Sequence, residues 1–335
     1  ARKFNRYLRL KKFANTRLPL GKPMIMTVDY KSAVERIKGK YDAVIVGSDE
    51  VWKIDKSRTD LLFPSFYWLP GDIGGMKLAF AASANKTRSD ELDDSEREWL
   101  SGALSEFELI GVRDNLTYEL ITSIDGVDTA KVTKVPDPTF MLDLPVMDMR
   151  DMLISNGVDP NKPLAGILLT DAGLNRQVCA FFREQGYQTV SLLNSDDSAD
   201  VNLVGKLDPL QWACVFKYFS FCVTGRFHGA IFSIKNRVPL VVIDDATDYG
   251  SYESKILSLF RDIDPRMEPF YVNGFNGSLD TPALLRRLVP AARELMTDEF
   301  LAGGEYSLRR HCLDFLAKIA GVLATQRQPV ALGTS

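Results

Sequence analysis

A repeated pattern of short apolar runs, each followed by a stretch with helical spacing, constrains this sequence more than any other feature. Each run ends in a polar or glycine turn and is typical of the strand in a βα unit. The runs are apolar throughout instead of alternating, as expected for parallel strands covered by helices on both faces. The sequence therefore predicts an α/β fold. The runs are Tyr41–Val46, Lys77–Ala82, Leu109–Val112, Leu164–Leu169, Gln188–Leu193, Phe221–Thr224 and Pro239–Ile243.

Four stretches between these runs have helical spacing, and Ser95 with Glu98 forms the pattern of a capping box at the start of the first. A proline-framed segment, Val135–Pro145, interrupts the repeats where helix cannot continue. We therefore expect two domains, 1–145 and 146–324, with Tyr306–Leu323 as a terminal helix crossing back onto the first. The tail, Thr325–Ser335, is expected to be disordered. The predicted helices are Ser95–Phe107, Asn115–Ser123, Asn175–Gln185 and Pro209–Tyr218.

The charge balance and the cysteine content exclude several classes of protein. The chain has 335 residues with 41 Lys+Arg against 44 Asp+Glu, a net charge of −3, which excludes a generally basic protein that coats nucleic acid. Its four cysteines contain no CxxC pair, so neither a disulfide framework nor a zinc knuckle is expected. A reducing cytoplasm fits this usage. No apolar run approaches the roughly 18 residues that would span a bilayer.

The first 22 residues carry eight Lys/Arg and no acid. They lack the apolar core of a secretory signal and predict an exposed helix. Two interpretations stay open: a solvated helix that caps the domain, or a helix that lies on an anionic membrane surface through Phe4, Tyr7, Leu8 and Phe13. The second would place the protein in the cytoplasm at the inner membrane surface.

Ligands of open parallel sheets bind at the carboxyl ends of the strands, so the turns that follow the runs are the candidate site. Among these turns, Thr224–Gly229 has the most side chains that can bind an anion or exchange a proton. It contains Arg226, Phe227 and His228 between two glycines. Arginine offers a planar fork to carboxylate or phosphate, and histidine exchanges protons near neutral pH. A purely structural histidine is the alternative.

Gly47–Trp52 closes the first run in a similar way. Ser48 and Asp49 could bind an anion or sugar hydroxyls, and Trp52 could stack on a pyranose ring. The alternative is an N-cap and a core aromatic. Ser83, after the second run, joins these three as a candidate ligand-binding residue.

Arg113, after the third run, should project into a cleft between the two domains, with a salt bridge to Asp114 or Asp137 as the alternative. The Asp137–Thr139 segment reads as a domain hinge. No GxGxxG, GxxxxGK[ST] or GxSxG motif occurs, and no cluster has metal-ligand spacing. We therefore expect neither a cofactor nor a metal.

The ordered blocks Gly47-Ser48-Asp49-x-x-Trp52, Ala81-Ala82-Ser83, Val112-Arg113-Asp114, Asp137-Pro138-Thr139 and Gly225–Gly229 resemble those of the polysaccharide pyruvyl transferases. The resemblance runs from about residue 25 to 260. It implies two Rossmann-like, doubly wound domains in a glycosyltransferase-B-like arrangement, the first on the acceptor side and the second on the donor side.

The activity that the resemblance implies is transfer of the pyruvyl group of phosphoenolpyruvate onto two hydroxyls of a sugar. The product is a cyclic ketal of cell-surface polysaccharide biosynthesis, on an acceptor that could be lipid-linked. The donor-site roles fall on Arg226, Phe227, His228 and Arg113, and His228 is the expected general acid.

The sequence departs from the family pattern in two places. Nothing before Tyr41 matches the glycine-asparagine-glycine-aspartate loop that usually opens relatives, so the chain is either shortened or diverged there. Glu50 and Lys53 replace a common Gln and Asn. Two alternative functions therefore stay open: a nucleotide-sugar glycosyltransferase or epimerase of the same architecture, and a non-catalytic sugar-binding relative.

Overall fold

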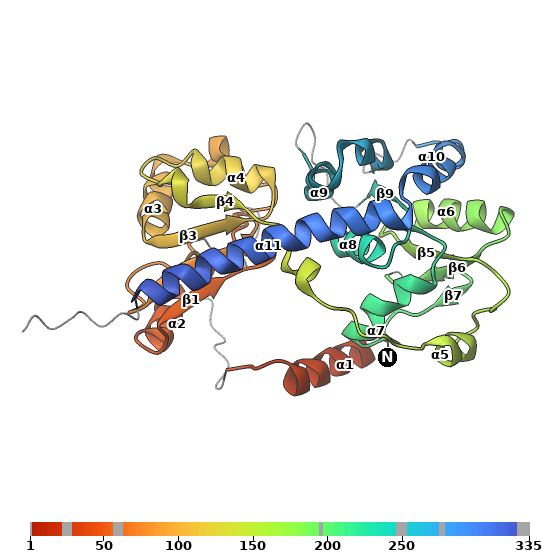
Figure 1. The fold of residues 1–335 in the computed structure, drawn as a ribbon, viewed down its shortest axis with the longest axis horizontal. Coiled ribbons are helices and arrows are strands. Elements are labelled where there is room, and N and C mark those ends of the chain that lie inside the picture. The colour runs from red at the N-terminus through yellow and green to blue at the C-terminus, as the bar shows by residue number, and fades with distance from the viewer. Residues whose placement is uncertain are drawn as a thin grey trace, which may run out of the picture. The chain divides into compact units, whose positions relative to one another are not determined.

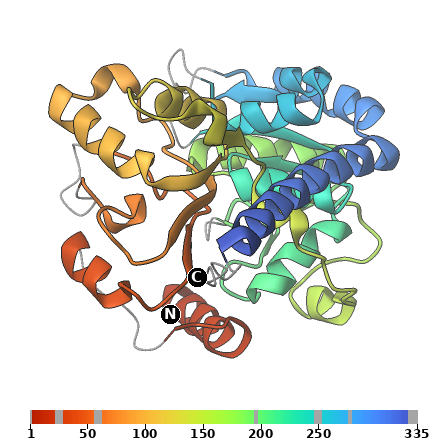
Figure 2. The same cartoon turned by 60° about the vertical axis from the view of Figure 1, so that its left-hand side comes forward.

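The computed structural model describes residues 2–21, 29–55, 63–193, 197–245, 253–274 and 279–326. The chain divides into two compact units, each built from three segments. We call Pro23–Met141, Ser251–Leu259 and Leu308–Ser335 the four-stranded unit, and Ala1–Lys22, Leu142–Gly250 and Phe260–Ser307 the six-stranded unit. Figures 1 and 2 show the elements of both units.

The four-stranded unit contains a parallel sheet whose strands follow one another in the order β1-β2-β3-β4. The three runs predicted in this part of the chain are confirmed as strands. The last and shortest strand was not predicted. The strands are β1 (Ala43–Val46), β2 (Met76–Ala82), β3 (Phe107–Val112) and β4 (Val132–Lys134).

Helices cover both faces of this sheet (Figure 1). On one face, α3 (Asp94–Ser105) and α4 (Asn115–Thr122) bury a cluster that includes Leu100, Leu104 and Ile121. On the other face, Leu78 and Phe80 of β2 pack against α11 (Asp298–Gln326). The apolar runs are therefore buried on both sides, as predicted.

The capping box of α3 lies two residues earlier than predicted. The Asp93 carboxylate accepts a hydrogen bond from the Glu96 backbone N–H at 2.9 Å, and the Glu96 carboxylate accepts one from the Asp93 N–H at 2.9 Å. The hydroxyl of Ser95 donates to the same Asp93 carboxylate at 2.7 Å. Asp93 is the N-cap because its carboxylate accepts from the N3 amide, and Ser95 lies inside the helix, so the assignment to Ser95 and Glu98 is wrong.

The six-stranded unit has the strand order β10-β9-β8-β5-β6-β7, with every pair parallel. Starting from β5, the chain adds two strands on one side and then three on the other, which is the Rossmann strand order. All four runs predicted here are confirmed; β7 and β10 were not predicted. The strands are β5 (Leu164–Leu168), β6 (Gln188–Ser191), β7 (Val201–Asn202), β8 (Phe221–Thr224), β9 (Leu240–Asp244) and β10 (Tyr271–Asn273).

This sheet is also covered on both faces (Figure 2). Phe221 of β8 lies 5.6 Å from the ring of Phe182 on α6, whereas its neighbour Cys222 points to the opposite face and contacts Ser233 of α8. Helix α10 packs beside α6. The helices of this unit are α1 (Arg2–Arg17), α5 (Arg150–Ser155), α6 (Ala172–Glu184), α7 (Pro209–Cys214), α8 (Phe227–Lys235) and α10 (Thr281–Leu295).

Of the remaining elements, α2 (Tyr30–Ile37) packs Val34 and Ile37 on Ile73. The stretch predicted as one helix at Pro209–Tyr218 is α7 followed by the 3-10 turn η5 (Val215–Tyr218). Helix α9 (Lys255–Ile263) begins in the four-stranded unit and ends in the six-stranded unit. The other 3-10 turns are η1 (Phe66–Trp68), η2 (Ser89–Glu91), η3 (Thr129–Lys131), η4 (Pro138–Met141) and η6 (Pro265–Phe270).

Helix α11 contains the predicted terminal helix and extends it in both directions. Its residues up to Ser307 group with the six-stranded unit, and those from Leu308 group with the four-stranded unit. There Phe315 packs against Phe80 with ring centroids 5.6 Å apart. The predicted return onto the first sheet is confirmed. Of the tail predicted as disordered, Thr325 and Gln326 are the last residues of α11, so the prediction is wrong there, and residues 327–335 lie outside the described part of the chain.

We expect the Phe315→Ala substitution to lower the free energy of unfolding by about 3 to 5 kcal/mol, because it leaves a cavity between α11 and the sheet. Phe315 is 2% exposed, whereas Leu313 on the same helix is 47% exposed. The matched Leu313→Ala substitution should therefore cost less than about 1 kcal/mol. Urea unfolding of both variants checks this, and equal losses would contradict the packing.

Candidate functional site

Two glycines that have no room for a side chain, Gly225 in the turn after β8 and Gly229 in the first turn of α8, shape this end of the strand. A Cβ on Gly225 would lie 2.6 Å from Asp245 Oδ1 and 2.7 Å from the Ile243 carbonyl oxygen. A Cβ on Gly229 would overlap the hydroxyl of Thr224. The turn therefore packs directly against the ends of β8 and β9, as the glycines of the motif predict.

This packing leaves two polar side chains of the turn at the surface. Arg226 and His228 are exposed, whereas Phe227 between them is 8% exposed. The Arg226 N–H donates to Thr224 Oγ1 at 2.9 Å, and α8 begins at the next residue. A helix N-terminus carries partial positive charge, so the exposed pair lies where an anion is stabilised.

The switch point of the Rossmann order falls between β5 and β8. A hollow of about 290 Å³ lies at the same edge of the sheet, lined by the start of α6, by residues that follow β9 and β10, and by the start of α10. Asp245 is part of its lining and accepts hydrogen bonds from the backbone N–H groups of Thr170 at 2.6 Å and Asp171 at 2.7 Å. This carboxylate joins the end of β5 to the end of β9 beside Gly225.

Cys222 of β8 does not add a nucleophile to this site. Its side chain is fully buried, and burial raises the pKa of the thiol to about 12. The sulfur therefore stays protonated at neutral pH and lacks the reactivity of a thiolate.

In the four-stranded unit, the turn after β1 crosses over the end of β2. Gly47 has φ +128°, and a Cβ there would overlap the Phe80 carbonyl oxygen. The Ser83 N–H donates to the Asp49 carbonyl at 2.9 Å, and the Trp52 N–H donates to the Ser83 carbonyl at 3.1 Å. The candidate residues Ser48, Asp49, Trp52 and Ser83 are thus brought together, but their side chains differ in exposure.

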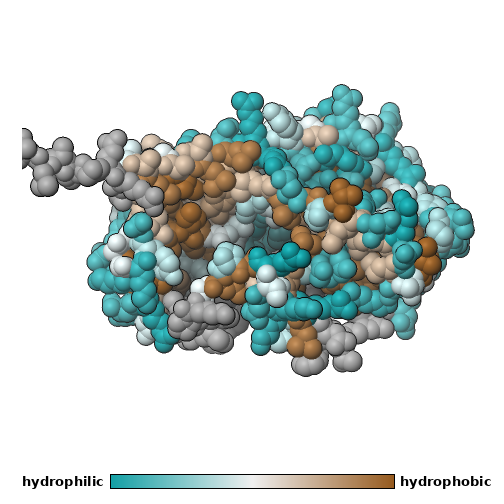
Figure 3. All heavy atoms as spheres, turned by 60° about the horizontal axis from the view of Figure 1, so that its bottom comes forward, coloured by the Kyte–Doolittle hydropathy of each residue, from teal (hydrophilic) through white to brown (hydrophobic). Residues whose placement is uncertain are grey.

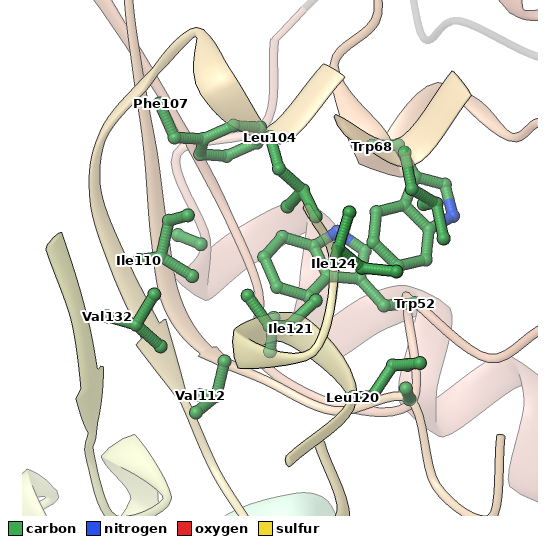
Figure 4. Close-up of a cluster of buried hydrophobic side chains, with 14 of the residues drawn as sticks. Trp52, Trp68, Leu104, Phe107, Ile110, Val112, Leu120, Ile121, Ile124 and Val132 are labelled. Carbon is green, nitrogen blue, oxygen red and sulfur yellow. The ribbon is translucent and has the colours of Figure 1, made fainter. Parts of the chain in front are cut away.

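Trp52 is a core residue (Figure 4). Its side chain is 0% exposed, and its ring stacks on Trp68 with centroids 4.8 Å apart and planes at 6°. The indole N–H donates to the Tyr67 carbonyl at 2.8 Å. Because neither face of the indole is open, the expectation that Trp52 stacks on a sugar gives way to the core-aromatic alternative.

Ser83 is also fully buried. Its hydroxyl donates to Asp114 Oδ2 at 2.6 Å and accepts from the Asn85 N–H at 3.0 Å. These bonds hold the ends of β2 and β3 together, so its expected contact with an acceptor is not supported. Ser48 is half-buried and the Asp49 side chain is 71% exposed, so these two of the four candidates reach the surface.

Arg113 forms the salt bridge that the sequence left as the alternative to a ligand contact. Its guanidinium lies 3.1 Å from Asp137 Oδ2, with both side chains at most 2% exposed, and 3.8 Å from Asp49 Oδ1. A buried ion pair is costly to break from one side, because the remaining charge is left uncompensated. Asp137 therefore holds Arg113 at the carboxyl edge of the sheet.

Residues from the start of α9 join this edge, which sequence reasoning missed. The Lys255 ammonium pairs with Glu50, whose other carboxylate oxygen accepts from the Asn85 amide at 3.0 Å. Ser258, one turn later, accepts from the Lys134 ammonium at 3.0 Å. No local motif marks these contacts. The one sequence feature that could have indicated a cationic partner was Glu50 itself, because it is an acid where relatives carry an amide.

The candidate residues therefore form two groups, one at the carboxyl edge of each sheet. Arg226 and His228 lie together on the six-stranded unit, and Arg113 lies with Ser48 and Asp49 on the four-stranded unit. Within the described ranges, no group of three or more His, Cys, Asp or Glu side chains is arranged to hold a metal ion.

The Asp137→Ala substitution is expected to destabilise the fold by about 3 to 5 kcal/mol, because the buried Arg113 charge loses its closest carboxylate. Asp49→Ala removes an exposed carboxylate 3.8 Å from the same guanidinium and should cost about 1 kcal/mol or less. Denaturant unfolding measures both. A loss for Asp137→Ala no larger than that for Asp49→Ala would contradict the assignment.

Solved structures with the same fold are distant in sequence. S. aureus MnaA, in a structure with UDP, is 10% identical with a TM-score of 0.57, covering 94% of this chain and 86% of that one. The Neisseria meningitidis UDP-GlcNAc 2-epimerase is 10% identical with a TM-score of 0.54, covering 91% and 84%. Sucrose-phosphate synthase from Thermosynechococcus elongatus is 12% identical with a TM-score of 0.51, covering 92% and 83%.

These similarities confirm the fold: two Rossmann-like units of the kind found in GT-B-type glycosyltransferases and epimerases. At such low identity they show no more than the fold. A search of curated proteins gave no match. A family model, described as polysaccharide pyruvyl transferase, matches residues 2–246, which include the R-F-H-G turn and the strand-end blocks of the four-stranded unit. The chain belongs to the polysaccharide pyruvyl transferase family.

Proposed function

We propose that this protein transfers the pyruvyl group of phosphoenolpyruvate onto two hydroxyls of a saccharide, forming a cyclic ketal and releasing phosphate. The observation that carries the proposal is the exposed pair Arg226 and His228 at the N-terminus of α8, in a chain of this family. The two side chains offer a fixed positive charge and a group that exchanges protons near neutral pH, next to each other.

The donor carries a carboxylate and a phosphate, and the turn has the charge to bind one of them. Arg226 can form paired hydrogen bonds to either group, and the α8 N-terminus adds a positive partial charge. Phe227 would contribute through its backbone, since its ring is buried. The role of Arg113 in donor binding stays a prediction from the resemblance.

The reaction requires a proton at the donor's methylene carbon. His228 would supply this proton or assist the departing phosphate. Cationic character then develops at the central carbon, which two sugar oxygens attack in turn while its bond to the phosphate oxygen breaks. Of the two hydroxyl protons released, one balances the new methyl group and the other leaves with phosphate.

Fewer residues are available to bind the acceptor sugar than the sequence predicted. Asp49, with its exposed carboxylate, is the proposed anchor or base for a sugar hydroxyl, and Ser48 lies beside it. Glu50 is less suited to that role because Lys255 and Asn85 both engage its carboxylate.

We expect His228→Ala to lower turnover by roughly a hundredfold or more, the usual scale for loss of an acid catalyst. The measurement is phosphate release from phosphoenolpyruvate that depends on a saccharide with adjacent free hydroxyls. The chain has two histidines, and His311 is exposed on α11, so His311→Ala is the matched control and should keep full activity. Full turnover by His228→Ala would refute the acid role.

Thermal-shift titration separates this proposal from its two alternatives. Phosphoenolpyruvate should raise the melting temperature, since a ligand at about 100 times its Kd adds about 2.7 kcal/mol of stability. Arg226→Gln should abolish that shift and leave the ligand-free melting temperature unchanged, because Arg226 is exposed.

Two other outcomes of this titration would contradict the proposed function and favour one of the alternatives. A shift with UDP but none with phosphoenolpyruvate would favour a nucleotide-sugar enzyme, the class to which the similar UDP-GlcNAc 2-epimerase of Neisseria meningitidis belongs. A shift with neither, but with an oligosaccharide, would favour a non-catalytic sugar-binding relative.

A further inference from the structure

Helix α1 and the residues after it leave a series of large apolar side chains exposed. Tyr7 is 57% exposed, Leu8 and Leu10 are each 46%, Leu18 is 49% and Leu20 is 43%. An ordinary surface helix turns its apolar stripe toward the core. This stretch does not bury one, so the solvated-cap interpretation explains its charges but not its leucines.

The charges of this stretch are of one sign. Arg9, Lys11, Lys12 and Arg17 lie among the exposed apolar residues. The Lys11 ammonium lies 5.9 Å from the Tyr7 ring centroid. Residues 1–22 hold eight of the chain's 41 Lys+Arg and none of its 44 Asp+Glu. The positive charge is therefore concentrated at one place on a chain that is acidic overall.

The two sides of the helix have different surroundings. A hollow of about 600 Å³ lies between α1 and Asp208, the N-cap of α7; the α1 residues that line it are Leu8, Arg9, Lys12, Phe13, Thr16 and Arg17. Tyr7, Leu10 and Lys11 are absent from that lining. In a helix with 3.6 residues per turn, Tyr7 and Lys11 lie on the side opposite its middle, and Leu10 lies between Tyr7 and the edge of the lining. Figure 3 views the molecule from the side that carries α1, where hydrophobic and hydrophilic side chains are intermingled.

We propose that α1 docks on the surface of an anionic lipid bilayer. Tyr7, Leu10 and Leu18 enter the boundary between headgroups and acyl chains, and Lys11, on the same side as Tyr7, pairs with lipid phosphates. Arg9, Lys12 and Arg17, which line the hollow, add longer-range attraction to the anionic surface. Interfacial helices combine these features: an apolar face, basic residues and low overall hydrophobicity. Cationic side chains near an anionic leaflet add attraction that salt screens.

A bilayer explains the composition better than a nucleic acid or an acidic protein does. A nucleic-acid site needs the cations but gains nothing from exposed leucines. Its basic residues would also be spread over a broader surface. An acidic partner protein that takes a helix into a groove would enclose apolar side chains on more than one side of it. Here Tyr7, Leu10 and Leu18 share one side of the segment, whereas Leu8 lines the hollow on another side, so a single row faces outward, as on a helix that lies flat on a lipid surface.

Co-sedimentation with lipid vesicles tests the proposal. The full chain should sediment with vesicles of equimolar phosphatidylcholine and phosphatidylglycerol and stay in solution with pure phosphatidylcholine. Replacing Arg9, Lys11, Lys12 and Arg17 together by Gln should weaken partitioning by roughly fivefold per charge. The matched control replaces the exposed Lys31, Arg36, Lys38 and Lys40 of the α2 region by Gln, and it should bind as the parent does.

The apolar contribution is tested separately with Tyr7→Ser/Leu10→Ser. This pair should reduce binding at high salt at least tenfold, whereas Leu313→Ser/Leu316→Ser on α11, which are 47% and 36% exposed, should not. Unchanged melting temperatures show that each variant is folded.

Three results would overturn the proposal: equal binding of the parent chain to both vesicle types, equal loss in the α2 control, or full binding by Tyr7→Ser/Leu10→Ser with release by soluble heparin. The last result would identify a general polyanion site. Binding is measured without phosphoenolpyruvate, so its failure would leave the proposed transferase function unaffected.

Discussion

The parallel arrangement of the strands is the constraint on which the rest of this molecule depends. It brings the carboxyl ends of consecutive strands to one edge of each sheet, whatever their distance in sequence. Asp245 can therefore join β5 to β9 across the Rossmann switch point, and Ser83 and Asp114 can join β2 to β3. The polar residues need these positions because both faces of each sheet are covered by helices and have no room for them.

Burial decides which of these edge residues can meet a ligand. Trp52, Ser83 and Arg113 all belong to the blocks that resemble the family pattern, yet the first two are fully buried and the third is held by Asp137. Motif membership alone does not separate a residue that builds the edge from one that faces a ligand. On the six-stranded unit, Gly225 and Gly229 allow the backbone to pack closely against β8 and β9. The side chains of Arg226 and His228 therefore stay exposed to solvent, where a ligand can reach them.

Sequence reasoning recovered the seven longer strands and the return of α11, because continuous apolar runs and helical spacing are properties of local sequence. It missed β4, β7 and β10, each of which is two or three residues long and lies at the edge of its sheet. An edge strand pairs on one side only and needs no apolar run. The Glu50–Lys255 pair was missed for a different reason: its partners are about 200 residues apart, and only the fold brings them together. The predicted domain boundary near residue 145 and the assigned site roles stay predictions.

The crowding around Gly225 and Gly229 has a consequence for anyone who would alter this protein. Neither position can accept even a methyl group without displacing the backbone of β9 or the side chain of Thr224. A library of variants aimed at new ligand preference would therefore yield folded members when it varies the exposed Arg226. At either glycine, it would return mostly misfolded chains.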